Sequence, residues 1–459
     1  MSRHPVRDAI LTIVGLIAIA VALHFIGIHG ASKFKQALAM FAIWGIATVS
    51  LNLINGVTGI LSLGHHGFML VGGYVTALLI LPTTAREGLQ ASARSSLSDF
   101  AISLSVEGWL HNLGLEFLTT PETHGARFVI ALIVGGLVAA VMGIIVGFPS
   151  LRLRGDYLAI VTFAFGEAIR LLASTPMFSS FTNGALGYSG VPTQFGKSIW
   201  WTFGALSITV FILSRLKYSS YGRALMGIRE DPVAVEAMGV NASYHKVLAF
   251  AISAFFAGVA GGLWVSWMGA ARLDLFMFFL TFYFLVAISV GGTGSVTGAL
   301  LGTALVVAVR QYGDPLEKAY PMSTWTIVVV GILAAIAVGV WLYRRTNRMR
   351  PTMSPTVWGM LGLAAIGGGA LLFFGDSAFF TSTWQGFGLR AIALAVILIS
   401  IMILKPVGVM GRNEFSWAAV FRERLDQPTE EERRQDAWLT NPELADSLSD
   451  DDEEEDSDA

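Results

Sequence analysis

Between residues 52 and 68 the chain reads Asn52-Leu-Ile-Asn-Gly-Val-Thr-Gly-Ile-Leu-Ser-Leu-Gly-His-His-Gly-Phe68, which interrupts two apolar stretches, 35–54 and 64–81. A helix broken at membrane depth is tolerated only where it is buried in protein or lines a water-filled cavity. The alternative interpretation is a plain turn between two helices at the membrane surface. If the break lines a cavity, the residues that would face it are Asn52, Asn55, Gly56, Gly59, Ser62, Gly64 and His65. His65 and His66 are adjacent and do not share one helix face, so we expect no metal site.

The composition places this break in a membrane protein. Of 459 residues, 54% are apolar or aromatic and only 14% are charged, whereas soluble domains carry about 25% charged residues. A bilayer core needs roughly 17–25 mostly apolar helical residues, and continuous apolar runs exclude a β-barrel. We predict an all-α, polytopic transmembrane helical bundle, in which 199–214 and 275–290 are short enough to be partial or tilted. The twelve predicted spans are 9–28, 35–54, 64–81, 128–148, 156–173, 199–214, 248–268, 275–290, 295–311, 323–343, 357–375 and 388–404.

The charges predict the orientation and the soluble parts. Nine acids and no Lys or Arg lie from Asp446 onward, so the net charge of −2 hides a body of +7. Counted from a cytoplasmic N-terminus, inner segments hold thirteen Lys or Arg and outer segments eight, which favours both termini inside. The stretch 9–28 is longer than a signal-peptide core and is interpreted as a retained span. We expect a membrane domain over 1–412 with an external polar insertion at 82–127. A cytoplasmic tail follows at 413–459, with a disordered acidic end.

A second break and one acid lie inside the membrane. Gly291-Gly-Thr-Gly-Ser-Val-Thr-Gly-Ala-Leu-Leu-Gly302 separates two predicted spans. Glu167 lies twelve residues into its span, and intramembrane carboxylates face the bundle interior or water. Arg170 is one turn further on, so we favour a structural i,i+3 ion pair, with Arg170 reaching outward, over direct substrate contact.

The segment 217–247 is predicted to be a cytoplasmic loop that contains a short capped helix. Asp231 is suited to cap it, Pro232 to its first position and Gly239 to its end. The enclosed helix of about 10 Å is too short to hold in water alone. It must therefore be held by the bundle, by a partner or by both.

These motifs resemble one known family. Gly222–Asn241 looks like the coupling loop of ABC-importer permeases of the branched-chain amino-acid family, on its LivM-like side. A second stretch resembles the signature that is most distinctive of that family. It reads Phe148-Pro-Ser-Leu-Arg-Leu-Arg-Gly-Asp-Tyr-Leu-Ala-Ile-Val-Thr-Phe-Ala-Phe-Gly-Glu-Ala-Ile-Arg170. The two Gly-rich breaks are similar to its Gly-rich segments and occur in the same order. The resemblance covers roughly residues 35–311.

The resemblance implies a permease subunit of a bacterial cytoplasmic (inner) membrane importer. Its implied partners are a second, LivH-like permease subunit, two cytoplasmic ATPase subunits, an external solute-binding protein and membrane lipids, with no nucleic acid. No cofactor is expected in this chain, because the partner subunits use the ATP. The implied ATPase-coupling residues are Arg229, Glu230, Asp231, Glu236 and Gly239. The implied translocation pathway comprises the residues of the first break together with Thr162, Glu167, Gly291, Gly292 and Gly294.

The chain departs from the family pattern at positions predicted to lie outside. Thr182-Asn-Gly-Ala-Leu-Gly187 replaces a Thr-Gly-Gly pattern, and Ala271-Arg-Leu-Asp274 stands where Ser-Pro is usual. The insertion 82–127 is expanded, and two extra spans precede the terminal Leu404–Arg412. These differences bear on the substrate and on docking of the binding protein. Branched-chain or other apolar amino acids are expected, with urea and short amides as the alternative.

Other classes of protein fit less well. A phosphate-binding loop has no match, because Gly196-Lys197-Ser198 is preceded by a glycine one residue too far away. The absence of cysteine excludes thiolate metal sites and cysteine nucleophiles. A membrane enzyme would need clustered His and carboxylates, which the spans lack, so we expect no enzyme activity. An ATP-independent, ion-coupled carrier is the remaining alternative.

Overall fold

The computed structural model describes residues 21, 23–82, 124–150, 156–313, 319–321, 383–385, 395–396, 398–399, 408 and 410–411. The chain divides into two units, one formed by residues 1–30 with 413–459 and the other by residues 31–412. In the first unit, the described residues 21 and 23–29 are helical. Everything below concerns the second unit.

Eight helices occupy the positions of the eight predicted spans between residues 35 and 311. They are α2 (Ser32–Asn52), α3 (His65–Ile80), α7 (His124–Ser150), α8 (Asp156–Ser174), α10 (Ile199–Tyr218), α13 (Ala242–Met268), α14 (Phe279–Gly291) and α15 (Val296–Tyr312). Within the described part of the chain, six helices are long and apolar enough to cross a membrane, and α3 and α15 are shorter apolar helices. The predicted spans 9–28, 323–343, 357–375 and 388–404 lie wholly or mostly outside the described residues, as do the insertion 82–127 and the tail.

Short elements connect these helices. They are the π-helix η1 (Leu53–Val57), α9 (Pro176–Thr182), α11 (Ser220–Glu230), α12 (Pro232–Ala237) and the 3-10 helix η4 (Leu273–Phe276). The all-α prediction is amended by two antiparallel pairings, β1 (Tyr188–Ser189) with β2 (Ala270–Ala271) and β3 (Ala319–Pro321) with β4 (Thr383–Gln385). The helix at the predicted span 199–214 is longer than predicted. It has 20 residues, and its last turn contains Arg215 and Lys217. The span predicted at 275–290 is indeed short as a helix, with η4 completing it.

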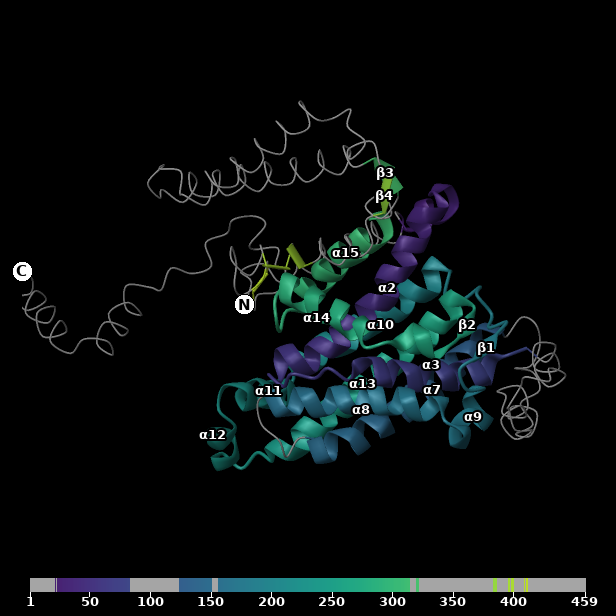
Figure 1. Ribbon diagram of the computed structural model, residues 1–459. Coiled ribbons are helices and arrows are strands. Elements are labelled where there is room, and N and C mark those ends of the chain that lie inside the picture. The colour runs from purple at the N-terminus through teal and green to yellow at the C-terminus, as the bar shows by residue number, and fades with distance from the viewer. Residues whose placement is uncertain are drawn as a thin grey trace, which may run out of the picture. The chain divides into compact units, whose positions relative to one another are not determined.

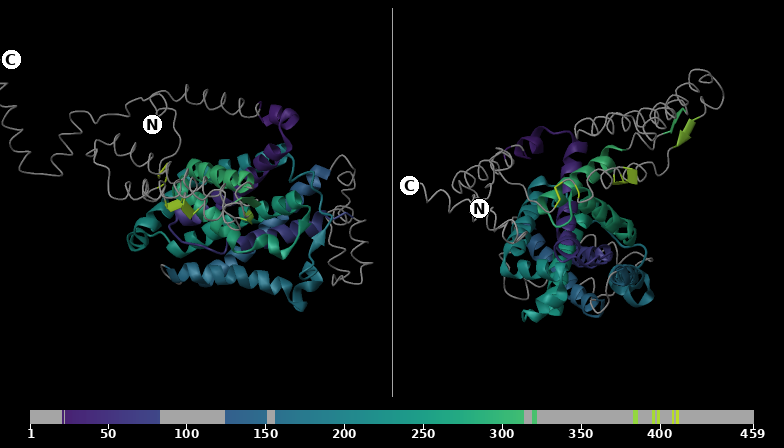
Figure 2. Two further views of the ribbon diagram at one scale, coloured as in Figure 1. Left: turned by 45° about the horizontal axis from the view of Figure 1, so that its top comes forward. Right: turned by 90° about the vertical axis from the view of Figure 1, so that its left-hand side faces the viewer.

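The centre of the bundle is formed by α2 and α13. Helix α13 packs against α7, α3 and α2, and α2 packs against α10 and α15; Figures 1 and 2 show this packing from three directions. In the most apolar part of each helix, 83% of the residues are buried in α2 with η1 and 78% in α13. The corresponding share is 28% in both α8 and α10. Glycines permit the close approach, since the backbones of Gly72 in α3 and Gly258 in α13 meet directly.

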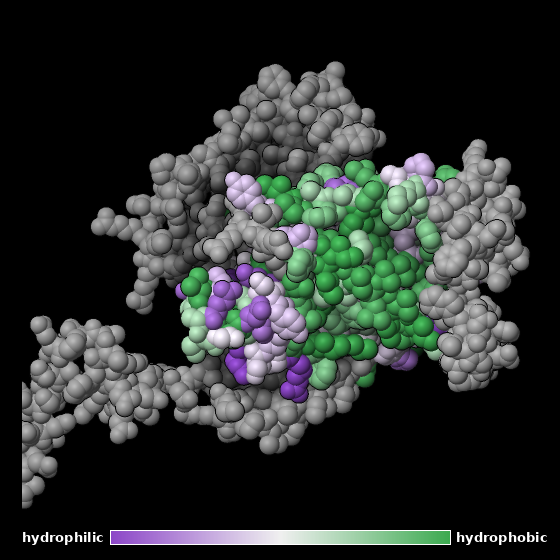
Figure 3. Space-filling model, turned by 90° about the horizontal axis from the view of Figure 1, so that it is seen from below, coloured by the Kyte–Doolittle hydropathy of each residue, from purple (hydrophilic) through white to green (hydrophobic). Residues whose placement is uncertain are grey.

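The outer surface of the bundle is apolar. Leu137, Val141 and Ile145 of α7 are each more than half exposed, and Figure 3 shows a broad hydrophobic surface bounded by hydrophilic residues at the end where α11 and α12 lie. A soluble protein rarely exposes so large a patch. The described part is therefore a multi-pass membrane bundle. Its two ends differ, because α11 and α12 lie at one end and α9 with the β1–β2 pair at the other (Figure 1).

We predict that Gly258→Ala destabilises the bundle by about 1–3 kcal/mol, the usual cost of overpacking. A Cβ at Gly258 would lie 2.6 Å from the Cβ of Ala139, so a helix must shift. The control is Gly204→Ala in α10, where nothing lies within 4 Å of the new Cβ. That variant should be neutral or slightly stabilising, since Ala favours the helix by roughly 0.5–1 kcal/mol. Thermal unfolding of the purified proteins in detergent measures both, and equal midpoints would contradict the packing described.

Candidate functional site

The first break is a folded segment rather than a loose turn. Helix α2 ends in η1, and Gly59 then adopts a φ of +72°, which favours glycine. The Asn55 side chain holds the returning chain, because its Oδ1 accepts from Ser62 N at 3.0 Å and its Nδ2 donates to Ser62 O at 3.4 Å. Leu63 N then donates to Thr162 Oγ1 of α8 at 3.1 Å. The break is thus an ordered and mostly buried segment, although Leu61 within it is 44% exposed.

The second break lies between α14 and α15. Gly292 and Gly294 have φ values of 125° and 93°, in the region that side chains disfavour. Ser295 caps α15, since its Oγ accepts from Gly298 N at 3.0 Å. Met410 N donates to Gly291 O at 2.9 Å, so the last carbonyl of α14 has a partner from a distant part of the chain. The backbone groups released by this break are therefore satisfied inside the protein.

Asn52 joins the two breaks. Its Oδ1 accepts from Gly294 N at 2.9 Å, and its Nδ2 donates to Ser295 O, also at 2.9 Å. The side chain is buried, with 1% exposed. A Cβ on Gly56 would collide with the backbone of Gly294, so the two breaks also touch directly. One amide thus gives Gly294 N an acceptor from the other break, and it adds a second donor to Ser295 O, which also accepts from Ala299 N at 3.0 Å.

Arg229, in the last turn of α11, reaches the same point. Its Nη1 donates to the carbonyl oxygen of Gly56. A Cβ placed on Gly59 would lie only 2.6 Å from Arg229 Cγ, and a Cβ placed on Gly294 would lie 3.4 Å from Arg229 Nη1. The sequence assigned Arg229 to coupling and the glycines to the pathway, and the structure brings the two groups into contact.

Helix α12 follows α11 and projects from the bundle. The predicted caps are confirmed: Asp231 Oδ1 accepts from Val233 N at 2.8 Å and Ala234 N at 3.2 Å, and Gly239 has a φ of +85°. No residue of α12 is buried. Sequence reasoning missed the apolar side chains here, since Val233 is 68% exposed and Met238, just after the helix, is 84% exposed. The apolar residues of this loop, which include Val235 and Val240 as well, were the signal that could have found them.

Helix α11 is anchored to α13 through Tyr221. The Tyr221 hydroxyl donates to His245 O at 2.7 Å, and the two rings stack. Burial raises the pKa of Tyr221, so the hydroxyl stays protonated and can donate this bond. The α11–α12 unit is therefore held at one end by Tyr221 and at the other by Arg229.

Glu167 belongs to a separate cluster between α3 and α8. The predicted ion pair is present, with Arg170 Nε and Nη2 each 2.8 Å from Glu167 Oε2. The Arg170 side chain remains 24% exposed in this pair. His66 Nε2 lies 3.5 Å from the other carboxylate oxygen, and His66 Nδ1 lies 3.0 Å from Thr281 Oγ1.

The sequence assigned His65 to the pathway, whereas the histidine beside Glu167 is its neighbour His66. His65 is fully buried, and its Nε2 lies 2.9 Å from Ser50 Oγ. Adjacent residues on a helix point about 100° apart, so only one of the pair can face α8. Gly67 packs closely on Gly166, because a Cβ on Gly67 would lie 2.9 Å from the Gly166 Cα. This contact turns His66 toward α8. Among the described residues, no group of three or more His, Asp or Glu could hold a metal ion.

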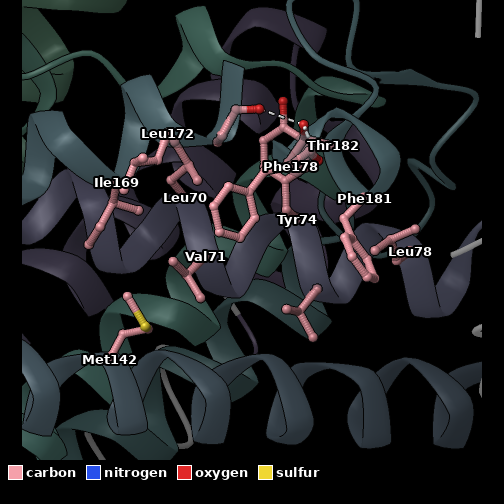
Figure 4. A pocket seen from close by; sticks show the side chains of 12 residues that line it. Leu70, Val71, Tyr74, Leu78, Met142, Ile169, Leu172, Phe178, Phe181 and Thr182 are labelled. Atoms are coloured by element: carbon pink, nitrogen blue, oxygen red, sulfur yellow. Dashed lines mark hydrogen bonds between the residues drawn. The ribbon is translucent and has the colours of Figure 1, made fainter. Parts of the chain in front are cut away.

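An apolar cavity of about 380 Å³ lies between α3, α7, α8 and α9. Figure 4 shows side chains from these four helices pointing into it. Thr182 of α9 lines the cavity, but its hydroxyl is already hydrogen-bonded, because Oγ1 donates to Ala173 O at 2.5 Å. The cavity therefore suits an apolar group and offers no charge. The lining residues are Leu70, Val71, Tyr74, Val75, Leu78, Met142, Ile169, Leu172, Ala173, Phe178, Phe181 and Thr182.

Comparisons with known proteins agree with this arrangement. The family model described as branched-chain amino acid transport system / permease component matches residues 34–319. The chain is 30% identical to the high-affinity branched-chain amino acid transport system permease protein LivM of Salmonella typhimurium, over 66% of this chain and 68% of the relative. It is 25% identical to LivH of the same organism, over 62% and 85%. It is 26% identical to the fructose import permease protein FrcC of Rhizobium meliloti, over 61% and 82%. No solved structure matches the chain significantly.

We predict that Asn52→Leu destabilises the protein by about 1–3 kcal/mol, because it removes the acceptor of Gly294 N and one of the two donors to Ser295 O in the interior. The matched control is Asn55→Leu, which also loses two side-chain hydrogen bonds, but only part-buried ones to Ser62 within a single break. Thermal unfolding in detergent should show the larger loss for Asn52→Leu. A larger loss for Asn55→Leu would mean that the contact between the breaks is unimportant.

Proposed function

The chain belongs to the family of branched-chain amino acid transport system permease components, and we propose that it is the transmembrane permease subunit of an ATP-driven ABC importer. Other subunits would hydrolyse the ATP, and this chain would form part of the pathway. The observation that carries the proposal is the contact of Arg229 with Gly56. It joins α11, which leads directly into the short exposed helix α12, to the interrupted helices inside the bundle.

The proposed mechanism is a mechanical bias between two arrangements of the breaks. A partner that binds α12 better in one arrangement shifts the equilibrium by its difference in affinity. Because Val235 of α12 packs closely on Gly227 of α11, a displacement of α12 would pass to α11. Tyr221 would serve as the pivot on α13, and Arg229 would carry the movement to Gly56. Glu230, Asp231, Glu236 and Gly239 would form the surface and the caps that the ATPase contacts.

The proposed assembly follows from the two different ends. The α11–α12 end faces the cytoplasm, where two ATPase subunits bind, and the opposite end faces an external solute-binding protein. Both termini then lie in the cytoplasm of a bacterial cell, as the positive-inside count favours. A second, LivH-like permease subunit completes the pathway. The exposed Val233 and Met238 would give the ATPase an apolar contact at the centre of its interface.

The proposed substrates are branched-chain or other apolar amino acids. The LivM and LivH relatives carry that specificity in their names, and the fructose permease relative extends the range of cargo that a related bundle serves. Asn52, Ser62, Gly64, Thr162, Gly291 and Gly292 are proposed as pathway residues near the breaks, with Asn55, Gly56, Gly59, His65, Glu167 and Gly294. Urea, short amides and fructose belong in the same uptake panel as leucine, isoleucine and valine.

The test is uptake by proteoliposomes that contain this chain with its LivH-like, ATPase and binding-protein partners. Leucine uptake should require ATP and all the subunits, whereas uptake driven by an ion gradient without the ATPases would identify a carrier. Glu236→Lys and Gly239→Pro should insert and fold but separate ATP hydrolysis from uptake. The first reverses the charge on the exposed helix, and the second cannot adopt the φ of +85°. Wild-type uptake in both variants would contradict the role of α12.

A second test concerns the contact inside the bundle. Arg229→Leu should lower ATP-driven uptake by roughly tenfold or more, a typical coupling energy, while ATP hydrolysis persists. Arg229→Lys should recover part of the uptake, because it keeps one donor for Gly56 O. The control is Arg223→Leu in the same helix, since Arg223 bonds only nearby groups in the contacts described, Tyr218 O at 3.2 Å and Ser220 Oγ at 2.9 Å. Equal uptake by the Arg229→Leu and Arg223→Leu variants would refute the role of Arg229.

A further inference from the structure

We infer that a second cavity, between α13, η4, α14 and α15, binds an apolar amino acid in its zwitterionic form. We call it the outer cavity and define it by Trp264, Asp274, Tyr283 and Arg310, which line it. Arg310 would bind the carboxylate of the ligand and Asp274 its ammonium group. The inference rests on the proposed function, because it assigns a place in this chain to the proposed class of substrate.

The outer cavity lies at the end of the bundle opposite to α12. It is formed where α13 ends at Met268, where α14 begins at Phe279 and where the last turn of α15 carries Arg310. His245, which contacts α11, lies near the other end of α13, about 35 Å away at 1.5 Å per residue. In the proposed importer this end faces the solute-binding protein, so a substrate released there meets the outer cavity before the two breaks.

The size of the outer cavity suits one small molecule. Its volume is about 230 Å³, which is the volume of roughly eight water molecules in the liquid. Pockets for drug-sized ligands begin at about 300 Å³. A single amino acid is therefore a suitable occupant, and a peptide is not.

The wall of the outer cavity carries both signs of charge. Asp274 pairs with Arg272, whose Nε and Nη2 lie 3.1 and 2.6 Å from the two carboxylate oxygens. The Asp274 side chain remains 46% exposed in this pair, and a carboxylate has about four lone-pair sites, so it can also accept from an ammonium group. With Arg310, the described wall has two arginines for one aspartate, and this excess of positive charge favours a ligand that carries a carboxylate.

Aromatic rings hold Arg310 in position. Its guanidinium carbon lies 5.1 Å from the centre of the Trp44 ring and 5.3 Å from that of Tyr283, within the range of cation–π attraction. Attraction to the rings does not consume N–H groups, which are the groups that bind a carboxylate. The guanidinium is therefore positioned before a ligand arrives, which lowers the entropic cost of binding.

Buried indole N–H groups lie beside Arg310. Trp264 is 2% exposed, and its Nε1–H has no acceptor among the described residues. The same is true of Trp44, whose ring centre lies 5.9 Å from that of Trp264. A buried donor without an acceptor costs free energy, and a carboxylate bound in the cavity would accept from Trp264. The surplus of donors is what recognition of a carboxylate requires.

The remaining wall is suited to the side chain of an apolar amino acid. Met268, Met277 and Leu280 line the outer cavity, and methionine adapts its shape to the apolar group that it meets. A sugar such as fructose would leave its hydroxyl groups against these side chains and would bring no charge for Arg310. The wall therefore favours leucine over fructose.

A leucine analogue whose side chain carries a diazirine tests the site directly, because illumination attaches it to the residues that surround it. The probe is added to the complete complex in excess over the binding protein, and the labelled residues of this chain are located by mass spectrometry. We expect adducts on Met268, Met277 or Leu280 that an excess of leucine prevents. This readout does not require ATP.

Competition by matched compounds identifies the chemical groups that are recognised. 4-Methylpentanoate lacks the ammonium group of leucine, and 3-methylbutylamine lacks its carboxylate. Each should compete with the probe less well than leucine by roughly tenfold or more, because each loses an interaction with a charged side chain. Fructose should not compete.

Two substitutions assign these groups to residues. Arg310→Gln should abolish the labelling that leucine prevents. Asp274→Asn should bring leucine and 4-methylpentanoate closer in competition, because the partner of the ammonium group is lost. The control is Lys197→Gln, since Lys197 is an exposed basic residue just before α10 that does not line the outer cavity. It should leave the labelling and the order of the competitors unchanged.

The competition series on the unsubstituted complex needs no variant to fold, so the inference can fail by that series alone. Labelling that leucine prevents only at other residues, such as those of the apolar cavity beside α9, would overturn it, as would the absence of such labelling. Equal competition by leucine and 3-methylbutylamine would do the same. Failure of the proposed function is distinct, because it appears as loss of ATP dependence of uptake by the unsubstituted complex.

Discussion

A backbone amide or carbonyl inside an apolar bundle must have a hydrogen-bond partner, and the interrupted helices of this protein release several such groups at once. The partners come from three separate segments of the chain. Because each segment supplies what another lacks, no break can rearrange without affecting the other or α11.

The bundle divides into a fixed centre and a less buried periphery. Helices α2 and α13 are largely enclosed, whereas α8 and α10 are mostly exposed within the chain itself. Glycine contacts such as Gly72 with Gly258 hold the central helices at short range. The charged pair Glu167–Arg170 lies on one of the peripheral helices. This distribution places the closest packing in the centre and the Glu167–Arg170 pair on a peripheral helix.

Much of this was predictable from the sequence, because apolar length alone fixes where helices cross a membrane. Helices lie at the positions of the eight central spans, and six of them are long enough to cross a membrane. The caps at Asp231 and Gly239 follow from local residue patterns, and the structure confirms them. The contact of Arg229 with Gly56 joins residues 173 positions apart, so no local pattern contains it. That His66 and not His65 lies beside Glu167 depends on how α3 is rotated against Gly166, which is a property of packing. The predicted pathway residues remain predictions, since burial alone does not identify a route.

Helix α12 has six residues, no buried side chain and two caps that belong to its own loop. Within α12 only Val235 is partly buried, so few of its side chains contact the rest of the bundle. In the proposed importer, exchange of α12 between related transporters would therefore change which ATPase the chain accepts and leave substrate selection unchanged. On that proposal the two specificities are able to diverge independently.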